Sequence, residues 1–252
     1  MSRLVIRKAG KTLESAAEWA QHAAPAADGS VWIAGQAEFE LAHAFFPKPG
    51  DAVVPDALQK MMNSHPVIGV QQWIQGIPGY QVKPDLQSNS THRFDLMGVT
   101  AGSEGRCALG IEAWTDGGFG PLIADQLKRS RPGSQWATGI QRLSKAVLGV
   151  GAAESGHLRC GLIHAAAAAL RAAEIEKAAI AVLVFYKFRL PDGRGQQRQG
   201  NLSALDALSA ALGGQPLKDG VLSGPFRVPG GSDIPASVPL FLGKLVSFLP
   251  VG

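Results

Sequence analysis

The chain has 252 residues, of which 46% are hydrophobic and 17% are charged. This composition excludes an intrinsically disordered chain, and the length is sufficient for one large folded domain with a hydrophobic core. The formal net charge of +4 permits contact with phosphate groups but is far from the dense positive charge of dedicated DNA-binding modules.

Residues 1–30 are expected to form an N-terminal leader, and residues 31–252 a single α/β domain. Within the leader, Ser15 and Glu18 have the spacing of a capping box, which predicts a short helix through residue 22. The apolar run at residues 4–6 is too short for a signal peptide, and no later run reaches the roughly 18 apolar residues of a membrane span. A cytoplasmic protein without a membrane partner is therefore expected.

Two helices are predicted next, at residues 36–46 and 55–62, where apolar side chains recur at helical spacing. Residues 66–84 contain several prolines and glycines, and no regular element is predicted there.

Residues 92–99 and 107–114 are predicted as the two strands of a β-hairpin, because the glycines and serine between them favour a turn. With the turn centred near Ser103 and Glu104, Asp95 and Glu112 are equally far from it. They are then expected to be cross-strand partners with both side chains on one face of the sheet.

The second half of the chain follows an α/β plan. Helices are predicted at residues 139–148, 158–179 and 201–212, and residues 180–188 form a nearly continuous apolar run typical of a strand buried on both faces. Residues 238–242 are expected to add a late edge strand or a packed extension. The order of hairpin, helix and strand is that of an α/β fold.

A pair of carboxylates at a strand end is a suitable site for Mg²⁺, which binds one or two carboxylates together with waters and phosphate oxygens. Such an ion can activate water for phosphodiester hydrolysis, and a lysine two residues beyond the glutamate would share its face of the strand. In this sequence, the residue two positions after Glu112 is Trp114.

Four segments together resemble an uncharacterised bacterial family that we assign to the PD-(D/E)XK nuclease superfamily. They are residues 93–96 (Arg-Phe-Asp-Leu), 110–120 (Gly-Ile-Glu-Ala-Trp-Thr-Asp-Gly-Gly-Phe-Gly), 158–164 (Leu-Arg-Cys-Gly-Leu-Ile-His) and 238–243 (Val-Pro-Leu-Phe-Leu-Gly). The resemblance implies a restriction-endonuclease-like fold, a mixed central sheet flanked by helices. It also implies that Asp95 and Glu112 bind Mg²⁺, with Glu40 on the first helix as a further acid.

The chain departs from this family at three positions. Trp114 replaces the catalytic lysine, Gly117 replaces a second glutamate, and Gly161 replaces a helix glutamine. An indole cannot act as a base, so the expected function is a catalytically inactive or weak nuclease-fold protein that binds nucleic acid, DNA rather than RNA, or a protein partner. The alternative is an active Mg²⁺-dependent nuclease in which Lys187 supplies a displaced catalytic amine. A structural subunit that contacts no nucleic acid is the third hypothesis.

Each of these residues also has a structural interpretation. Asp95 could accept hydrogen bonds from the backbone, Glu112 could pair with Arg93 or Arg106, and His164 could be a buried core histidine. Two basic clusters are interpreted as solvated surface, namely Lys128, Arg129 and Arg131, and Lys187, Arg189, Arg194 and Arg198. Cys107 and Cys160 lie in apolar segments and are predicted to be buried thiols.

Overall fold

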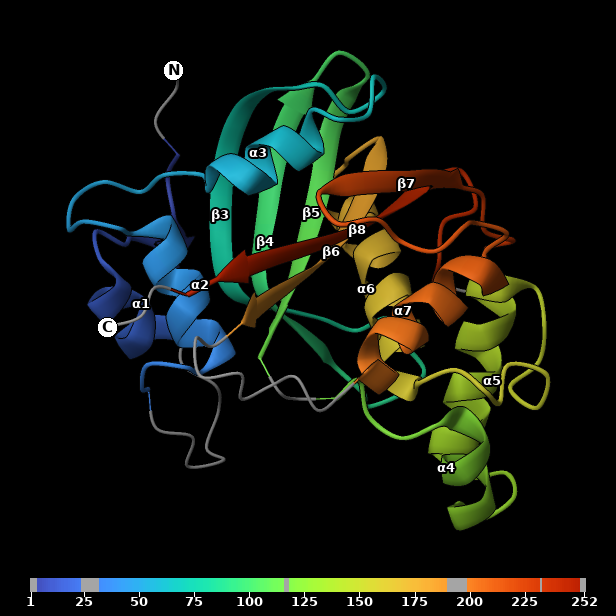
Figure 1. Cartoon of the computed structure of the whole chain (residues 1–252). Helices are drawn as coiled ribbons and strands as arrows, with labels where there is room; N and C mark the ends of the chain where they lie inside the picture. Colours follow the sequence, from blue (N-terminus) through green and yellow to red (C-terminus); the bar gives the residue numbers. More distant parts are fainter. Residues whose placement is uncertain (1–3, 24–31, 116–117, 190–198, 232, 250–252) are drawn as a thin grey trace.

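A mixed sheet of six strands forms the centre of the computed structural model, which describes residues 4–23, 32–115, 118–189, 199–231 and 233–249 (Figure 1). The strand order is β3-β4-β5-β6-β8-β7. The strands are β3 (Val70–Val82), β4 (His92–Gly102), β5 (Gly105–Trp114), β6 (Ile180–Arg189), β7 (Val221–Phe226) and β8 (Leu240–Phe248). The expected α/β class, a mixed sheet with helices on its faces, is confirmed.

The directions of the strands divide the sheet into two parts. Strands β3, β4 and β5 form an antiparallel meander, whereas β5, β6 and β8 run parallel to one another. Strand β7 pairs antiparallel with β8 at the edge. The C-terminal segment expected as an edge strand is therefore an interior strand, because β7 covers its outer side. The prediction of no regular element in residues 66–84 was also wrong, since β3 spans 13 of these residues.

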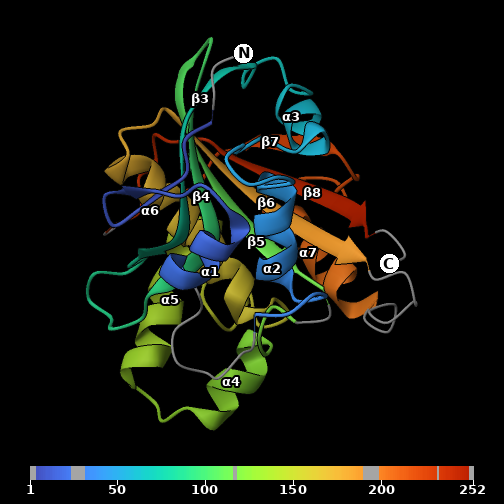
Figure 2. The same cartoon turned by 90° about the vertical axis from the view of Figure 1, so that its left-hand side faces the viewer.

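Helices cover both faces of the sheet, and each face has its own hydrophobic cluster (Figures 1 and 2). One cluster contains side chains of α1 (Ala16–Ala23), α2 (Ala37–Phe45) and α3 (Asp56–Met62); we call this the α2 face. The other contains side chains of α4 (Ile123–Arg129), α5 (Gln135–Leu148), α6 (Cys160–Ile175) and α7 (Gln199–Ala211); we call this the α6 face.

The alanine-rich helix α6 and strand β6 form the interior of the α6 face. Alanine has the highest helix propensity, and its small side chain lets a helix pack closely against the sheet. In β6, every residue from Ile180 to Phe188 is buried, and successive residues alternate between the two clusters. This confirms the prediction of a strand covered on both sides. Both cysteines are buried free thiols, as predicted.

The described part of the N-terminal leader is integrated into the domain. Ile6, Leu13 and Trp19 are buried in the cluster of the α2 face, and the backbone N–H of Gly76 in β3 donates to the carbonyl oxygen of Val5. Ser15 Oγ accepts the backbone N–H of Glu18, as the capping-box spacing predicts. The boundary expected near residue 30 therefore does not separate two packing units. A short ribbon of β1 (Arg7–Lys8) and β2 (Lys11–Thr12) belongs to this segment.

No helix among the described residues combines the length and the apolar character that crossing a membrane requires.

Candidate functional site

The register of the β4–β5 hairpin is the one predicted from the sequence. The ladder runs from Gly102 opposite Gly105 to Leu96 opposite Ile111, and the turn lies at Ser103 and Glu104. Asp95 and Glu112 follow directly after the last pair of this ladder. The hairpin therefore brings both carboxylates to the same end of the sheet, away from its turn.

The alternation of side chains along β4 is interrupted at Asp95. Phe94 belongs to the cluster of the α6 face and Leu96 to that of the α2 face, although residues two apart in a regular strand share a face. The neighbouring strand has a matching irregularity, because Ile77 and Tyr80 both pack on the α6 face. Between them lies Gly79, whose φ of 55° is accessible to glycine without strain.

Lys8 of β1 stabilises the backbone at this irregularity. Its ammonium group donates hydrogen bonds of 2.8 Å to the carbonyl oxygens of Pro78 and Gly79. Burial, with the nearby charge of Arg93 as a second cause, lowers the pKa of Lys8. Lys8 thus satisfies carbonyl groups that face away from the regular ladder, so the N-terminal ribbon supports the strand beside Asp95.

The interruption places the two carboxylates on different faces of the sheet. Ile111 and Ala113 pack on the α2 face and Trp114 on the α6 face, so alternation directs Glu112 toward the α6 face. Asp95 follows Phe94, which points to the α6 face, and interacts with α2 on the opposite side. The expectation that both side chains share one face is corrected, because it assumed an unbroken β4.

Asp95 interacts with the backbone of β5 and with the side chain of Glu38. Its Oδ2 accepts the N–H of Ala113 at 2.6 Å, and its Oδ1 lies 3.8 Å from Arg93 Nη1. Burial raises the pKa of Asp95 well above its usual range, and the negative charges of Glu112 and Glu38 raise it further, against the opposing effect of the Ala113 N–H. The structural interpretation of Asp95, a carboxyl group bonded to a backbone donor, is confirmed.

Helix α2 supplies Glu38 rather than the predicted Glu40 to this site. Glu38 accepts a hydrogen bond from Arg93 and also bonds to the side chain of Asp95. Glu40 instead accepts the backbone N–H of Gly35 at 2.7 Å, before the start of α2. Residues two apart on a helix point about 200° apart, so only one of the two glutamates can face β4. The choice of Glu40 is therefore corrected to Glu38.

On the α6 face, Glu112 pairs with a histidine that was not singled out in the sequence. Glu112 Oε1 lies 2.7 Å from His92 Nε2, and the His92 ring packs edge-on against Phe94. The suggested partners of Glu112 are engaged elsewhere, since Arg93 contacts Glu38 and Arg106 contacts a backbone carbonyl. No signal for His92 was present in the sequence, because in an unbroken strand it lies three residues from Asp95 and would point to the face opposite Glu112.

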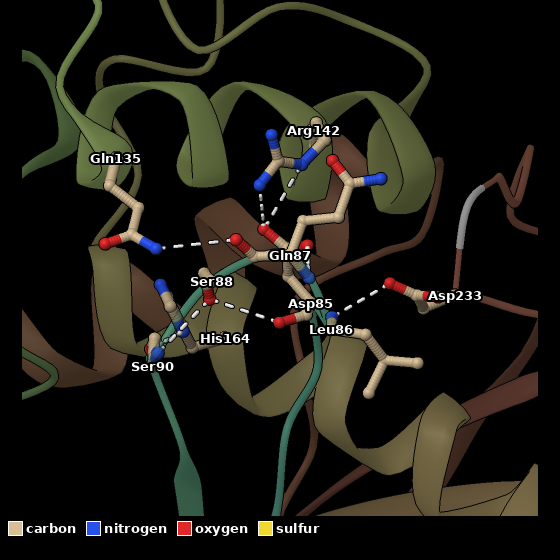
Figure 3. A network of polar contacts seen from close by, with 9 residues as sticks. All are labelled: Asp85, Leu86, Gln87, Ser88, Ser90, Gln135, Arg142, His164 and Asp233. Atoms are coloured by element: carbon tan, nitrogen blue, oxygen red, sulfur yellow. Dashed lines mark hydrogen bonds and ion pairs between the residues drawn. The ribbon is translucent and has the colours of Figure 1, made fainter.

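His164 of α6 lies near His92 and beneath the loop that joins β3 to β4. Its Nδ1 is 3.4 Å from Ser90 Oγ (Figure 3). Burial lowers the pKa of His164 to about 4, with the nearby His92 as a smaller cause and Asp85 opposing. His164 is thus a neutral imidazole near pH 7, which agrees with its interpretation as a core histidine.

The loop above His164 is anchored by a buried carboxylate. Asp85 Oδ2 accepts from Nε of Arg142, a residue of α5, at 3.2 Å, and Ser88 Oγ donates to the Asp85 carbonyl oxygen (Figure 3). Asp233 accepts the backbone N–H of Leu86 from the other side of the loop. These contacts connect the loop to α5 and to the segment after β7, and they keep Ser90 next to His164.

Lys187 and Trp114 meet at the ends of two neighbouring parallel strands. They are paired in the β5–β6 register, and Lys187 Nζ lies 4.5 Å from the centroid of the Trp114 ring. Lys187 is 4% and Trp114 5% exposed. The Trp114 ring also contacts Phe119, which packs against Phe185. Among the described residues, the indole Nε1 of Trp114 has no hydrogen-bond partner.

Gly161 has a packing role at the start of α6. Its N–H donates to the carbonyl oxygen of Phe119, and a Cβ at this position would lie 2.8 Å from that same oxygen. The glycine lets α6 begin against the backbone that carries Phe119. Gly117, Arg194 and Arg198 lie outside the described residues.

Asp95 and Glu112 are the carboxylates to which the resemblance assigns a Mg²⁺ ion, and besides burial, the negative charge of Glu112 raises the pKa of Asp95. The two carboxylates point to different faces, and the Arg93 guanidinium already supplies positive charge beside Asp95 and Glu38. Within the described ranges, no group of three or more His, Cys, Asp or Glu residues is placed to hold a metal ion.

The chain belongs to the family described as "Domain of unknown function (DUF6946)", which matches residues 12–247. Comparison with curated proteins and with solved structures gave no significant match.

Proposed function

We propose that this member of the family is a nuclease-fold protein of the PD-(D/E)XK kind that binds nucleic acid without hydrolysing it. The order of elements supports the fold: a helix, an antiparallel meander, the helix α6 and the parallel strand β6. Asp95 lies near the start of β4 and Glu112 near the end of β5, and the resemblance assigns the two carboxylates of the superfamily to these residues.

The observation that carries the proposal is the contact between Lys187 and Trp114. In an E-x-K strand, the lysine amine lies on the face of the glutamate and can orient a water molecule. Here an indole occupies that position, and the nearby buried ammonium group lies over its ring. A cation–π contact of a desolvated ammonium contributes about 2 kcal/mol, so moving Lys187 toward a phosphate would cost stability.

The site on the α2 face supports the same conclusion. A nuclease needs carboxylates that face a common ion, whereas Asp95 Oδ2 is engaged by the protein's own backbone, since it accepts the Ala113 N–H at 2.6 Å. Arg93 is bonded to Glu38 and lies close to Asp95. These contacts support a structural role for Glu38 and Asp95.

One observation favours the alternative of an active Mg²⁺-dependent nuclease. The β5–β6 register brings Lys187 level with Trp114, on the face toward which Glu112 points. A displaced amine is therefore at the end of the sheet where the superfamily's lysine belongs. In this alternative Lys187 would leave the Trp114 ring when substrate and metal bind.

A cleavage assay separates the two functions. The purified protein is incubated with Mg²⁺ or Mn²⁺ and with plasmid, linear duplex and single-stranded DNA, in parallel with RNA. Binding without cleavage is expected, and DNA should be bound in preference to RNA. The variants Asp95→Ala and Lys187→Met should likewise leave the nucleic-acid strands uncut. Cleavage that both variants abolish would establish the alternative, and absence of any nucleic-acid binding would favour a protein partner.

A further inference from the structure

Helix α4 and the residues that follow it carry an exposed basic group, Lys128, Arg129 and Arg131, which we call the α4 basic surface. All three side chains are exposed. Among the described residues they form no ion pair, not even with Asp125 one turn earlier in α4. In both views, α4 lies at the end of the molecule opposite the β4–β5 turn (Figures 1 and 2). This is also the end at which β5 and β6 present Trp114 and Lys187.

A set of contacts joins the segment just before α4 to the Trp114 site. Leu122, just before α4, forms a β-bridge with Arg159, whose guanidinium donates to the Gly120 carbonyl oxygen at 2.9 Å. The adjacent Phe119 packs on Trp114, and Trp114 contacts Lys187. These contacts fix the start of α4 relative to this end of the sheet, and Arg159 adds one basic residue near them.

The helix dipole accounts for only part of this group. Cations in the last turn of a helix are favoured by the partial negative charge there, which applies to Lys128 and Arg129. Arg131 lies beyond the end of α4, before Pro132 and Gly133, and gains little from that effect. Three positive charges within four residues, without acidic partners, form a surface that attracts a polyanion.

We propose that the α4 basic surface contacts the phosphodiester backbone of a bound nucleic acid and guides the strand toward the Trp114 end of the sheet. This inference rests on the proposed nucleic-acid binding and assigns a surface to it. Lys128 and Arg129 lie in the last turn of α4 and Arg131 two residues beyond its end, so the three positive charges are close enough together to contact neighbouring phosphates of one strand. Such a contact depends on the charge and spacing of the phosphate groups and not on the base sequence.

The test is the salt dependence of binding, measured by fluorescence anisotropy with labelled single-stranded and duplex DNA of mixed sequence. The variant replaces Lys128, Arg129 and Arg131 by alanine. The matched control replaces Lys60, Arg106 and Lys218, three exposed basic residues of other elements, and removes the same formal charge. Circular dichroism and urea unfolding verify that both variants fold.

Each phosphate contact contributes about 0.9 to the slope of log K against log salt for duplex DNA, and about 0.7 for a single strand. The α4 variant is expected to lower this slope by about 2 to 3 and to weaken binding at low salt at least about tenfold. The control variant should change the slope by less than about 1.

An unchanged slope in the α4 variant, or equal changes in both variants, would overturn this assignment while leaving nucleic-acid binding intact. A wild-type protein that binds neither DNA would overturn the proposed function itself, and the assignment with it.

Discussion

Lys187 Nζ lies 4.5 Å from the centroid of the Trp114 ring, and the two residues are partners across the parallel pair β5–β6. In the proposed nuclease fold, Trp114 stands at the position of the superfamily lysine, and the amine of Lys187 on the next strand lies over its ring. The indole fills the space with apolar surface, and its ring is one partner of the buried ammonium group. This relationship underlies the proposal of binding without hydrolysis.

Replacing Trp114 by lysine is expected to destabilise the fold rather than restore a nuclease. The change removes a buried ring, which costs about 3 to 5 kcal/mol, and places a second ammonium group beside Lys187. The double change Trp114→Lys with Lys187→Met keeps one amine and should recover part of this loss. Urea unfolding of both single variants and the double variant measures the coupling. An additive result would show that the two side chains do not interact.

Asp95→Asn is expected to be at least as stable as the wild type at pH 7, whereas Asp95→Ala should lose about 1 to 3 kcal/mol. Asparagine keeps an acceptor for the Ala113 N–H, while alanine leaves that donor unsatisfied. The folded-state pKa of Asp95 is raised above 3.8, so the unfolded chain releases the proton first as the pH rises.

The contribution of Asp95 is therefore fully present below pH 3.8 and is lost as the pH rises through its folded-state pKa. Urea unfolding of the three proteins across this range should show the loss in the wild type and not in Asp95→Asn. If the asparagine variant were as unstable as the alanine variant at pH 7, an ionised carboxylate would be required and this view of the site would be wrong.

Much of the candidate site was visible in the sequence because short-range geometry determines it. The glycines and serine of the turn set the hairpin register, and this brought Asp95 and Glu112 to the same end of the sheet. The apolar run of β6 and the alanine content of α6 likewise reflect local patterns with direct physical causes.

The features that the sequence did not reveal depend on tertiary contacts. Strand β3 contains Gly76, Pro78 and Gly79, which are unfavourable in strand interiors, and proline is tolerated because β3 lies at the edge of the six-stranded sheet. The break in alternation at Asp95 requires matching irregularities in two strands and the hydrogen bonds from Lys8. The pattern of apolar residues within one strand cannot predict such a combination of contacts.

Glu38→Gln is expected to lower the pKa of Asp95, whereas Glu40→Gln should leave it unchanged. The Glu38→Gln change removes a negative charge and a bonded partner of Asp95. The positive charge of Arg93 then acts on Asp95 without competition from Glu38. The Glu40→Gln change keeps an acceptor for the Gly35 N–H at a distance from Asp95. Carbon-13 NMR titration of the Asp95 carboxyl group measures both effects. Equal shifts in the two variants would contradict the assignment of Glu38 to the site.

His164 is expected to make the fold less stable in mild acid. Its pKa is lowered from 6.5 to about 4, so the unfolded chain takes up a proton before the folded protein does. Stability should therefore fall as the pH decreases from 6.5 toward 4, by at most about 3 kcal/mol. In His164→Gln, this part of the pH dependence should disappear from thermal or urea unfolding curves. An unaltered dependence would show that His164 is not buried in its neutral form.

The most direct measurement follows binding and cleavage in the same reaction. Labelled DNA is mixed with the wild-type protein and Mg²⁺ or Mn²⁺, and each sample is divided between a native and a denaturing gel. The proposal predicts a complex on the native gel that weakens with rising salt, together with intact strands on the denaturing gel. Strands cut by the wild type but left intact by Asp95→Ala and Lys187→Met would contradict it.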